Sequence, residues 1–282
     1  MSTPALADTA AAELVRPPRD AGTGTRPSRS WWVLPPLVVM LAGVVYPLVE
    51  VLRQSGEGGA WGSVLSSAQF LEALGTTLLI AISATAGCLV LGTYLAVVLA
   101  FVPFPGHRVV ARVIDTVLAL PSFVITLAFV LLYGVAGVFG SITRGTLVSS
   151  TLGVVLAEIT FFTPFVVRPL LAAFARFPRE QLDVAASLGA SPWTVATRVL
   201  LPEALPALAA GGGLCLLLTL NEFGIVLFTG ARDAITLPML IYTRGIVTFD
   251  LPGAAVIATV QVVLSLLLYV GYRALVRRLG RI

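Results

Sequence analysis

The chain has 282 residues, of which 57% are hydrophobic and only 11% are charged, whereas about a quarter of the residues in an ordinary soluble domain are charged. This composition excludes a soluble globular domain. The apolar segments are also too continuous for the alternating strands of a membrane β-barrel. Because helices satisfy their own backbone hydrogen bonds in lipid, the sequence predicts an all-α membrane protein.

The formal net charge is +4, and all 18 basic residues are arginines because the sequence contains no lysine. A phosphate-binding Walker A loop needs a lysine, so this chain is not expected to hydrolyse ATP by that route. The arginines occupy the tails and the ends of apolar segments, which favours membrane orientation over nucleic-acid binding. A single histidine, His107, and two isolated cysteines leave no pattern for a metal site or a catalytic cluster.

The N-terminal residues 1–30 are rich in Ala, Thr, Pro, Arg and Ser and have no apolar stripe. This composition is typical of a disordered tail. A first transmembrane helix is predicted from Trp31 to about Leu52, long enough to cross a hydrocarbon core of about 30 Å. A Gly-rich outer loop completes this region to residue 69.

Five further spans are predicted within a core of residues 70–276, which gives six transmembrane helices in total. They cover Phe70 to Phe101, Val110 to Tyr133, Leu152 to Ala173, Ala204 to Thr229 and Leu251 to Val276. Pro121 and Pro164 lie inside the third and fourth of the six spans and predict kinks rather than breaks. The Gly211-Gly212-Gly213 run predicts close helix packing. A short re-entrant or interfacial element is expected around Leu237 to Ile246.

The arginine distribution tests this number of spans. With the N-terminus inside, fourteen arginines fall on the cytoplasmic side and only Arg53, Arg144, Arg232 and Arg244 fall outside. Such an inside bias is the usual signature of membrane orientation. Both termini are therefore expected in the cytoplasm, the C-terminal one as a basic tail of residues 277–282.

The connection of residues 176–206 is the largest cytoplasmic loop of this topology. Glu180 to Leu188 has helical spacing, Gly189 permits a sharp turn, and Ser191-Pro192 has the pattern of a second helix start. Trp193, Ala196, Val199 and Leu200 would form an apolar face on a helix too short to span. Two short helices that meet at a glycine would make a rigid knob suited to a groove on a soluble partner.

Polar side chains inside predicted spans are costly and by default indicate function. Asn221 and Glu222 in the fifth span could line a translocation path or gate, or Glu222 could pair with a neighbouring arginine as a structural lock. Glu158 lies deep in the fourth span, where we expect a partner from another helix or subunit. Arg112 and Asp115 are spaced for an ion pair on one helix surface.

The stretch from Asp183 to Pro202 resembles the "EAA" loop of permease subunits of ATP-binding-cassette importers. The carboxylate is Asp183, the alanine pair reads Val184-Ala185, the glycine is Gly189, and the pattern ends at Leu201-Pro202. Asp replaces the usual Glu and Val replaces the first Ala. The resemblance extends over roughly Leu71 to Val276 and implies a type I importer transmembrane domain with a cytoplasmic coupling helix.

A second set of residues indicates a subgroup within this family. Leu220-Asn221-Glu222-Phe223-Gly224, Thr236 to Tyr242 and Phe249-Asp250 are similar to permeases for small oxyanions and related solutes, above all those for 2-aminoethylphosphonate. Alternatives within the family are sulfate, molybdate, ferric iron and polyamine. An anionic solute would be repelled by an unpaired carboxylate, which argues against direct contact with Glu222.

The resemblance implies partners rather than catalytic residues of the chain's own. It implies an ABC ATPase dimer that binds ATP, a second permease subunit as a homo- or heterodimer, and an extracytoplasmic solute-binding protein, all at a bacterial inner membrane. Asn221, Glu222, Phe223 and Glu158 are the candidates for the path or gate. An ion-driven secondary transporter would predict internal repeats, which the sequence lacks. An intramembrane enzyme would need a catalytic cluster.

Overall fold

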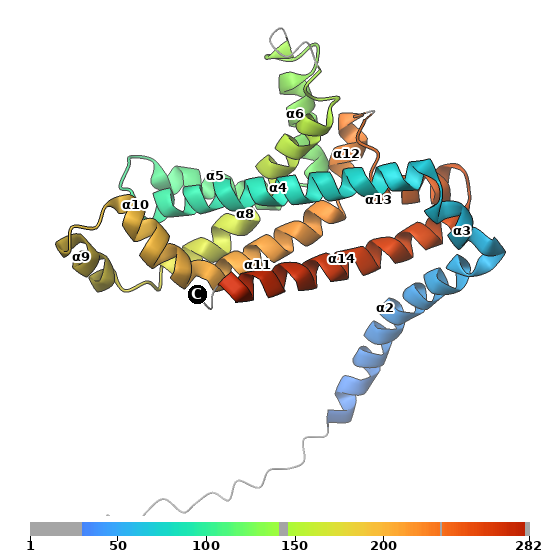
Figure 1. Ribbon diagram of the computed structural model, residues 1–282, viewed down its shortest axis with the longest axis horizontal. Coiled ribbons are helices and arrows are strands. Elements are labelled where there is room, and N and C mark those ends of the chain that lie inside the picture. The colour runs from blue at the N-terminus through green and yellow to red at the C-terminus, as the bar shows by residue number, and fades with distance from the viewer. Residues whose placement is uncertain (1–29, 141–145, 232, 280–282) are drawn as a thin grey trace, which may run out of the picture. The chain divides into compact units, whose positions relative to one another are not determined.

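The computed structural model describes residues 30–140, 146–231 and 233–279, and these contain helices and no strands. The long helices are α2 (Leu34–Ser55), α4 (Ala68–Phe101), α8 (Thr151–Phe174), α11 (Leu201–Leu220) and α14 (Leu251–Leu279). The shorter ones are η1 (Ser30–Val33), η2 (Glu57–Gly59), α3 (Ala60–Leu65), α5 (His107–Ala119), α6 (Ser122–Tyr133), α9 (Arg179–Ser187), α10 (Pro192–Val195), η3 (Ala196–Leu200), α12 (Gly224–Thr229), α13 (Leu237–Tyr242) and η4 (Thr243–Val247). Figure 1 shows this helical chain.

The chain divides into two compact units, residues Met1–Leu48 and Val49–Ile282. The described part of the first unit is η1 and the first turns of α2, whose large apolar side chains are exposed. Exposed apolar side chains over such a length suit a helix that faces lipid. The predicted disordered tail of residues 1–30 lies almost entirely outside the described residues.

The core of the second unit is formed by α4, α8 and α11, which pack against one another. Fully buried Phe162, Val166 and Leu170 of α8 lie at its centre. Glycines let the helices approach closely. A Cβ on Gly92 of α4 would lie 2.8 Å from Val166 Cβ, and one on Gly211 of α11 would lie 3.0 Å from the Phe165 carbonyl oxygen. The prediction that the glycine run of α11 serves helix packing is therefore confirmed.

Five helices are long and apolar enough to cross a membrane, and the bent pair α5 and α6 brings the number to six if it is one span. Each of the six predicted spans overlaps one of these segments, so the predicted fold class is confirmed. The predicted element around Leu237 to Ile246 is present as α13 and η4. The last helix, α14, continues to Leu279, so Arg277 and Arg278 belong to it and not to a separate tail.

The two prolines behave differently. Pro164 lies buried inside the continuous helix α8, so the prediction that it does not break the helix is confirmed. At Pro121 the prediction of a mere kink is wrong, because α5 and α6 are separate helices at 113° to each other. The residue before a proline is driven out of the α conformation. Leu120 and Pro121 are both extended, with ψ values of 140° and 145°.

The third predicted span is tied to the core by an ion pair. Asp115 of α5 pairs with Arg168 of α8. Arg112, the partner that the local spacing suggested for Asp115, makes none of the ion pairs formed among the described residues. A long-range contact thus replaces the expected pair on one helix.

Candidate functional site

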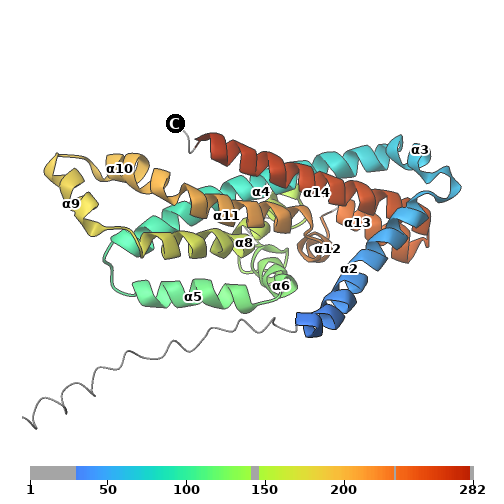
Figure 2. The same cartoon turned by 90° about the horizontal axis from the view of Figure 1, so that it is seen from below.

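The helix α9 stands apart from the long helices. Figure 1 and Figure 2 both show it at one end of the second unit, with α3 at the opposite end. Its inner face is anchored because Phe177, just before it, and Leu182 pack against the main hydrophobic core. The other face of α9 is left exposed.

A Schellman motif ends α9. The Gly189 N–H donates to the Ala186 carbonyl at 2.9 Å, and the Ala190 N–H donates to the Ala185 carbonyl at 3.0 Å. Gly189 has a φ of +76°, the left-handed conformation that this motif requires and that glycine adopts without strain. The predicted sharp turn at Gly189 is confirmed.

The next helix begins as predicted but does not end as predicted. The Ser191 hydroxyl accepts the Thr194 N–H at 3.2 Å, and Pro192 occupies the first turn. Beyond α10 the chain does not form a separate short helix. It continues through the π-helical turn η3 into α11 as one 29-residue helix, Pro192–Leu220. The prediction of a rigid knob made of two short helices is therefore wrong. Helix α9 is short, but α10 is the first part of a long helix.

The π-helical turn η3 has a local cause in Pro202. This proline in the first turn of α11 has no N–H for a regular bond to the preceding turn. The Leu201 N–H instead reaches back five residues to the Ala196 carbonyl. The helix accommodates Pro202 through this wider turn and continues as α11.

The structure brings together four of the six residues predicted for the coupling loop. Asp183, Val184, Ala185 and Gly189 lie on α9 and its cap, and Asp183 and Val184 are exposed. Leu201 and Pro202 instead lie on the first turn of α11. Two large apolar side chains in this region are almost free of contacts: Leu188 is 82% exposed and Trp193 is 77% exposed. Such exposed apolar groups are typical of an interaction surface.

The second group of predicted residues lies at the opposite end of the continuous helix from Pro192. The predicted fifth span was one helix to Thr229, which is wrong, because α11 ends at Leu220 and α12 begins at Gly224. Asn221 begins the break, and its amide donates to the Leu217 carbonyl at 2.8 Å. A side chain that bonds the backbone in this way competes with continuation of the helix.

Glu222 stabilises the start of the next helix. One oxygen of its carboxylate accepts the Ile225 N–H of α12 at 2.8 Å. Glu222 makes no ion pair with a described arginine, so the predicted alternative of an arginine lock finds no support in the described chain. Phe223 packs its ring against Tyr242 of α13 at a centroid distance of 5.1 Å.

The two broken helices meet at this point. The Ser122 hydroxyl, at the start of α6, lies beside the Glu222 carboxylate. Helices α6 and α12 pack against each other, with the Phe123 and Phe228 rings 6.0 Å apart. In Figure 1, α6 and α12 run across the direction of α4 and α14. Breaks with polar groups inside an apolar bundle are where transporters place solute sites and gates.

Gln261 of α14 also contacts the residues at the break. Its amide nitrogen donates to the Leu220 carbonyl at 2.6 Å and contacts the Asn221 side-chain oxygen at 3.4 Å. Sequence reasoning missed both Gln261 and Ser122. The signals available in the sequence were a glutamine within the apolar run of α14 and a serine directly after Pro121.

Glu158 differs from Glu222. It is fully buried in α8, and neither oxygen of its carboxyl has a hydrogen-bond partner. The expected partner from another helix is absent from the described residues. The ionisable groups around it are Glu222 and Cys88, and neither supplies a positive charge. Among the described residues, no group of three or more His, Cys, Asp or Glu side chains is placed to hold a metal ion.

Comparison with known proteins identifies the fold. A crystal structure of a bacterial ABC transporter involved in the import of the acidic polysaccharide alginate matches with a TM-score of 0.77 and 18% identity. That match covers 89% of this chain and 96% of the alginate transporter chain. An inward-facing MetNI methionine ABC transporter matches with a TM-score of 0.60 and 21% identity, over 74% of this chain and 95% of the other.

Sequence comparison gives the family. One relative is the "Putative 2-aminoethylphosphonate transport system permease protein PhnU" of Salmonella typhimurium (strain LT2), which is 46% identical over 88% of this chain and 93% of its own length. The sulfate transport system permease protein CysT of Escherichia coli (strain K12) is 33% identical over 83% of this chain and 86% of its own. The family model of binding-protein-dependent transport system inner membrane components matches residues 88–281. The chain therefore belongs to this family of ABC importer permeases, as its "EAA"-like segment and its six candidate spans indicated.

Proposed function

We propose that this permease imports 2-aminoethylphosphonate or a closely related phosphonate, with α9 as the helix through which a separate ATPase drives it. The likeness to a relative named for 2-aminoethylphosphonate transport, 46% identical over 88% of the chain, supports the solute. The exposed α9, with its apolar side chains and its fixed cap, supports the coupling role.

The proposed assembly has four kinds of component. Two permease subunits form the path, an ATPase pair binds ATP on the cytoplasmic side, and a solute-binding protein delivers the phosphonate from outside. The bias of fourteen arginines against four supports an orientation with both termini inside a bacterial inner membrane. The mass of the purified assembly distinguishes a second copy of this chain from a different permease.

The mechanism transmits movement along one helix. Movement of the ATPase displaces α9, and the cap at Gly189 passes this displacement to the start of α10. The 29 residues of Pro192–Leu220 form a rod of about 43 Å at 1.5 Å per residue. Its far end is the break at residues 221–223, where Asn221, Glu222 and Phe223 lie. A displacement at one end of the rod thus alters the packing of α6 and α12 at the other.

Capture of the ATPase tests the coupling role. We expect Leu188→Asp to lose the co-purified ATPase, because docking would bury an unpaired charge where an apolar side chain packs. Val135→Asp is the matched control, since Val135 is 81% exposed and Leu188 is 82% exposed. If Leu188→Asp retains the ATPase as well as Val135→Asp does, the docking role of α9 is wrong.

Uptake into proteoliposomes tests the solute. The complete importer, with its solute-binding protein and ATP, should accumulate labelled 2-aminoethylphosphonate and should not accumulate sulfate. Accumulation of sulfate alone would assign the chain to the other oxyanion branch. ATP-independent accumulation that follows an ion gradient would overturn the ATPase-driven mechanism itself.

A further inference from the structure

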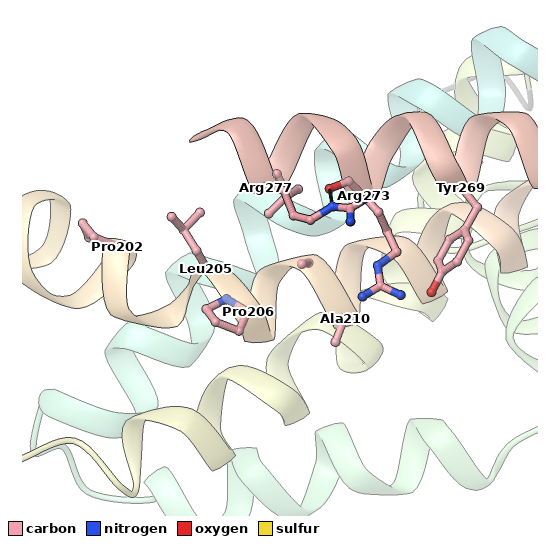
Figure 3. Close-up of a pocket in the computed structure, with 9 residues that line it drawn as sticks. Pro202, Leu205, Pro206, Ala210, Tyr269, Arg273 and Arg277 are labelled. Atoms are coloured by element: carbon pink, nitrogen blue, oxygen red, sulfur yellow. Dashed lines mark hydrogen bonds between the residues drawn. The ribbon is translucent and has the colours of Figure 1, made fainter. Parts of the chain in front are cut away.

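A groove of about 510 Å³ lies between α11 and α14, away from the break at residues 221–223. One wall is a face of α11 that includes Pro202, Leu205 and Pro206. The other wall is a face of α14 that includes Tyr269, Arg273 and Arg277. In Figure 3, Arg273 and Tyr269 extend from α14 toward α11.

The groove lies beside the close crossing of the two helices. They cross closely at the glycine run, because a Cβ on Gly212 would lie 2.1 Å from the Tyr272 hydroxyl oxygen. The Tyr272 hydroxyl fixes this crossing by donating to the Leu208 carbonyl at 2.9 Å. From there toward Pro202, the α11 wall includes the small side chains of Ala209 and Ala210. Small side chains at this spacing leave a hollow that larger ones would fill.

The groove carries positive charge without a matching negative group. Arg273 and Arg277 line it and are exposed, and neither takes part in an ion pair with a described acidic residue. The Arg273 guanidinium lies over the Tyr269 ring at 5.8 Å from its centroid, an arrangement that holds the guanidinium in place. A bound anion would complement the two arginines, whose planar donors suit phosphate oxygens.

Apolar surface continues from the arginines along α14. Leu266, Leu267 and Val270 are large, exposed and apolar, and they precede Arg273 along the same helix. An arginine and tyrosine end followed by an apolar length has the order of a membrane interface followed by the hydrocarbon core. A free phosphate would use only the charged end of this surface, whereas a phospholipid would use both parts.

We propose that this groove binds the head group of an anionic phospholipid of the inner leaflet, with Arg273 and Arg277 contacting its phosphate and the acyl chains lying along α14. Basic pockets between transmembrane helices on the cytoplasmic side are the usual sites for such head groups. The leaflet rests on the orientation in the proposed function, but the binding itself does not depend on the solute or on α9.

Native mass spectrometry of the purified full-length permease, in the assembly in which it is isolated, measures the lipid directly. Phosphatidylglycerol titrated into the detergent-solubilised protein should be retained more tightly than phosphatidylcholine. The double variant Arg273→Gln/Arg277→Gln should bind phosphatidylglycerol about 30-fold more weakly, as expected for two interfacial arginines. Excess inorganic phosphate should not displace the lipid.

Two further variants separate a groove from a merely basic surface. Arg278→Gln removes the same charge from the adjacent residue, which does not line the groove, and should weaken retention by no more than about fivefold. Ala210→Leu fills the groove with no change of charge and should weaken retention like the double variant. Equal retention of the two lipids, displacement by phosphate, or unchanged retention in Ala210→Leu overturns the proposal. These readouts do not involve transport, so failure of the proposed solute leaves them intact.

Discussion

The α9 region and the break at residues 221–223 are the two ends of the proposed mechanical path, and they are built in opposite ways. The shape of α9 comes from its own neighbours in sequence, through the Gly189 cap and the Ser191 cap. The break is held by residues far away in sequence, with Ser122 on one side and Gln261 on the other. An exposed element has few tertiary contacts and must be stabilised by interactions between sequence neighbours. A buried element can be stabilised by residues that are distant in the sequence.

The largest effect is expected at Gly189, in the region that is stabilised by its neighbours in sequence. A β-branched residue at a φ of +76° is strained by about 1–2 kcal/mol or more. Gly189→Val should therefore reduce transport-coupled ATP hydrolysis roughly tenfold, the equivalent of 1.4 kcal/mol in docking-competent protein. Measurement of ATPase activity with and without loaded solute-binding protein checks this result.

The control at the same position is Gly189→Asn. No atom lies within 4 Å of a Cβ built on Gly189, so any loss comes from the backbone and not from a clash. Asparagine tolerates the left-handed conformation far better than valine and should retain most of the coupling. Equal losses in both variants would mean that the glycine serves a close contact with the ATPase and not a turn.

The next largest effect is expected at Gln261, which stabilises the break at residues 221–223 through a contact between residues distant in sequence. Gln261→Met keeps the approximate size of the side chain but removes the donor to the Leu220 carbonyl. A buried acceptor left without a partner costs about 1–3 kcal/mol. Thermal unfolding of the purified protein should show a lower melting temperature, and an unchanged melting temperature would show that the bond does not hold the break.

A smaller effect is expected at Glu222. Glu222→Ala removes the acceptor for the Ile225 N–H, and loss of a helix-capping side chain costs about 1 kcal/mol. Glu222→Gln keeps an acceptor oxygen and should restore the melting temperature. If Gln restores stability but not solute uptake, the charge of Glu222 itself serves the path or gate.

The smallest effect on stability is expected at Glu158. Its carboxyl makes no hydrogen bond, so Glu158→Met removes an unsatisfied polar group and should leave the melting temperature unchanged or higher. This substitution is matched to Gln261→Met, which removes an amide nitrogen that donates to the Leu220 carbonyl. A clear fall in stability would mean that Glu158 has a partner in the assembled importer. Loss of uptake at full stability would support its predicted place on the path.

Local signals in the sequence were sufficient for much of the fold. Uninterrupted apolar length predicted the six spans, and the Gly189 and Ser191-Pro192 signals predicted where α9 ends and the next helix begins. The polar residues Asn221 and Glu222 identified the region of the break. Their long-range neighbours Ser122 and Gln261 could not be assigned, because nothing in the local sequence states which distant segment lies beside a given residue.

The sequence by itself determined that this chain crosses a membrane as helices and that a short helix ends at Gly189, because composition and caps act through neighbouring residues. The tertiary structure alone decided that Pro121 breaks a helix where Pro164 does not, that Asp115 pairs with Arg168, and that α11 ends at Leu220. The two helix breaks depend on which groups from other helices are available to bond or pack against the interrupted backbone, and the ion pair depends on which helix lies beside α5.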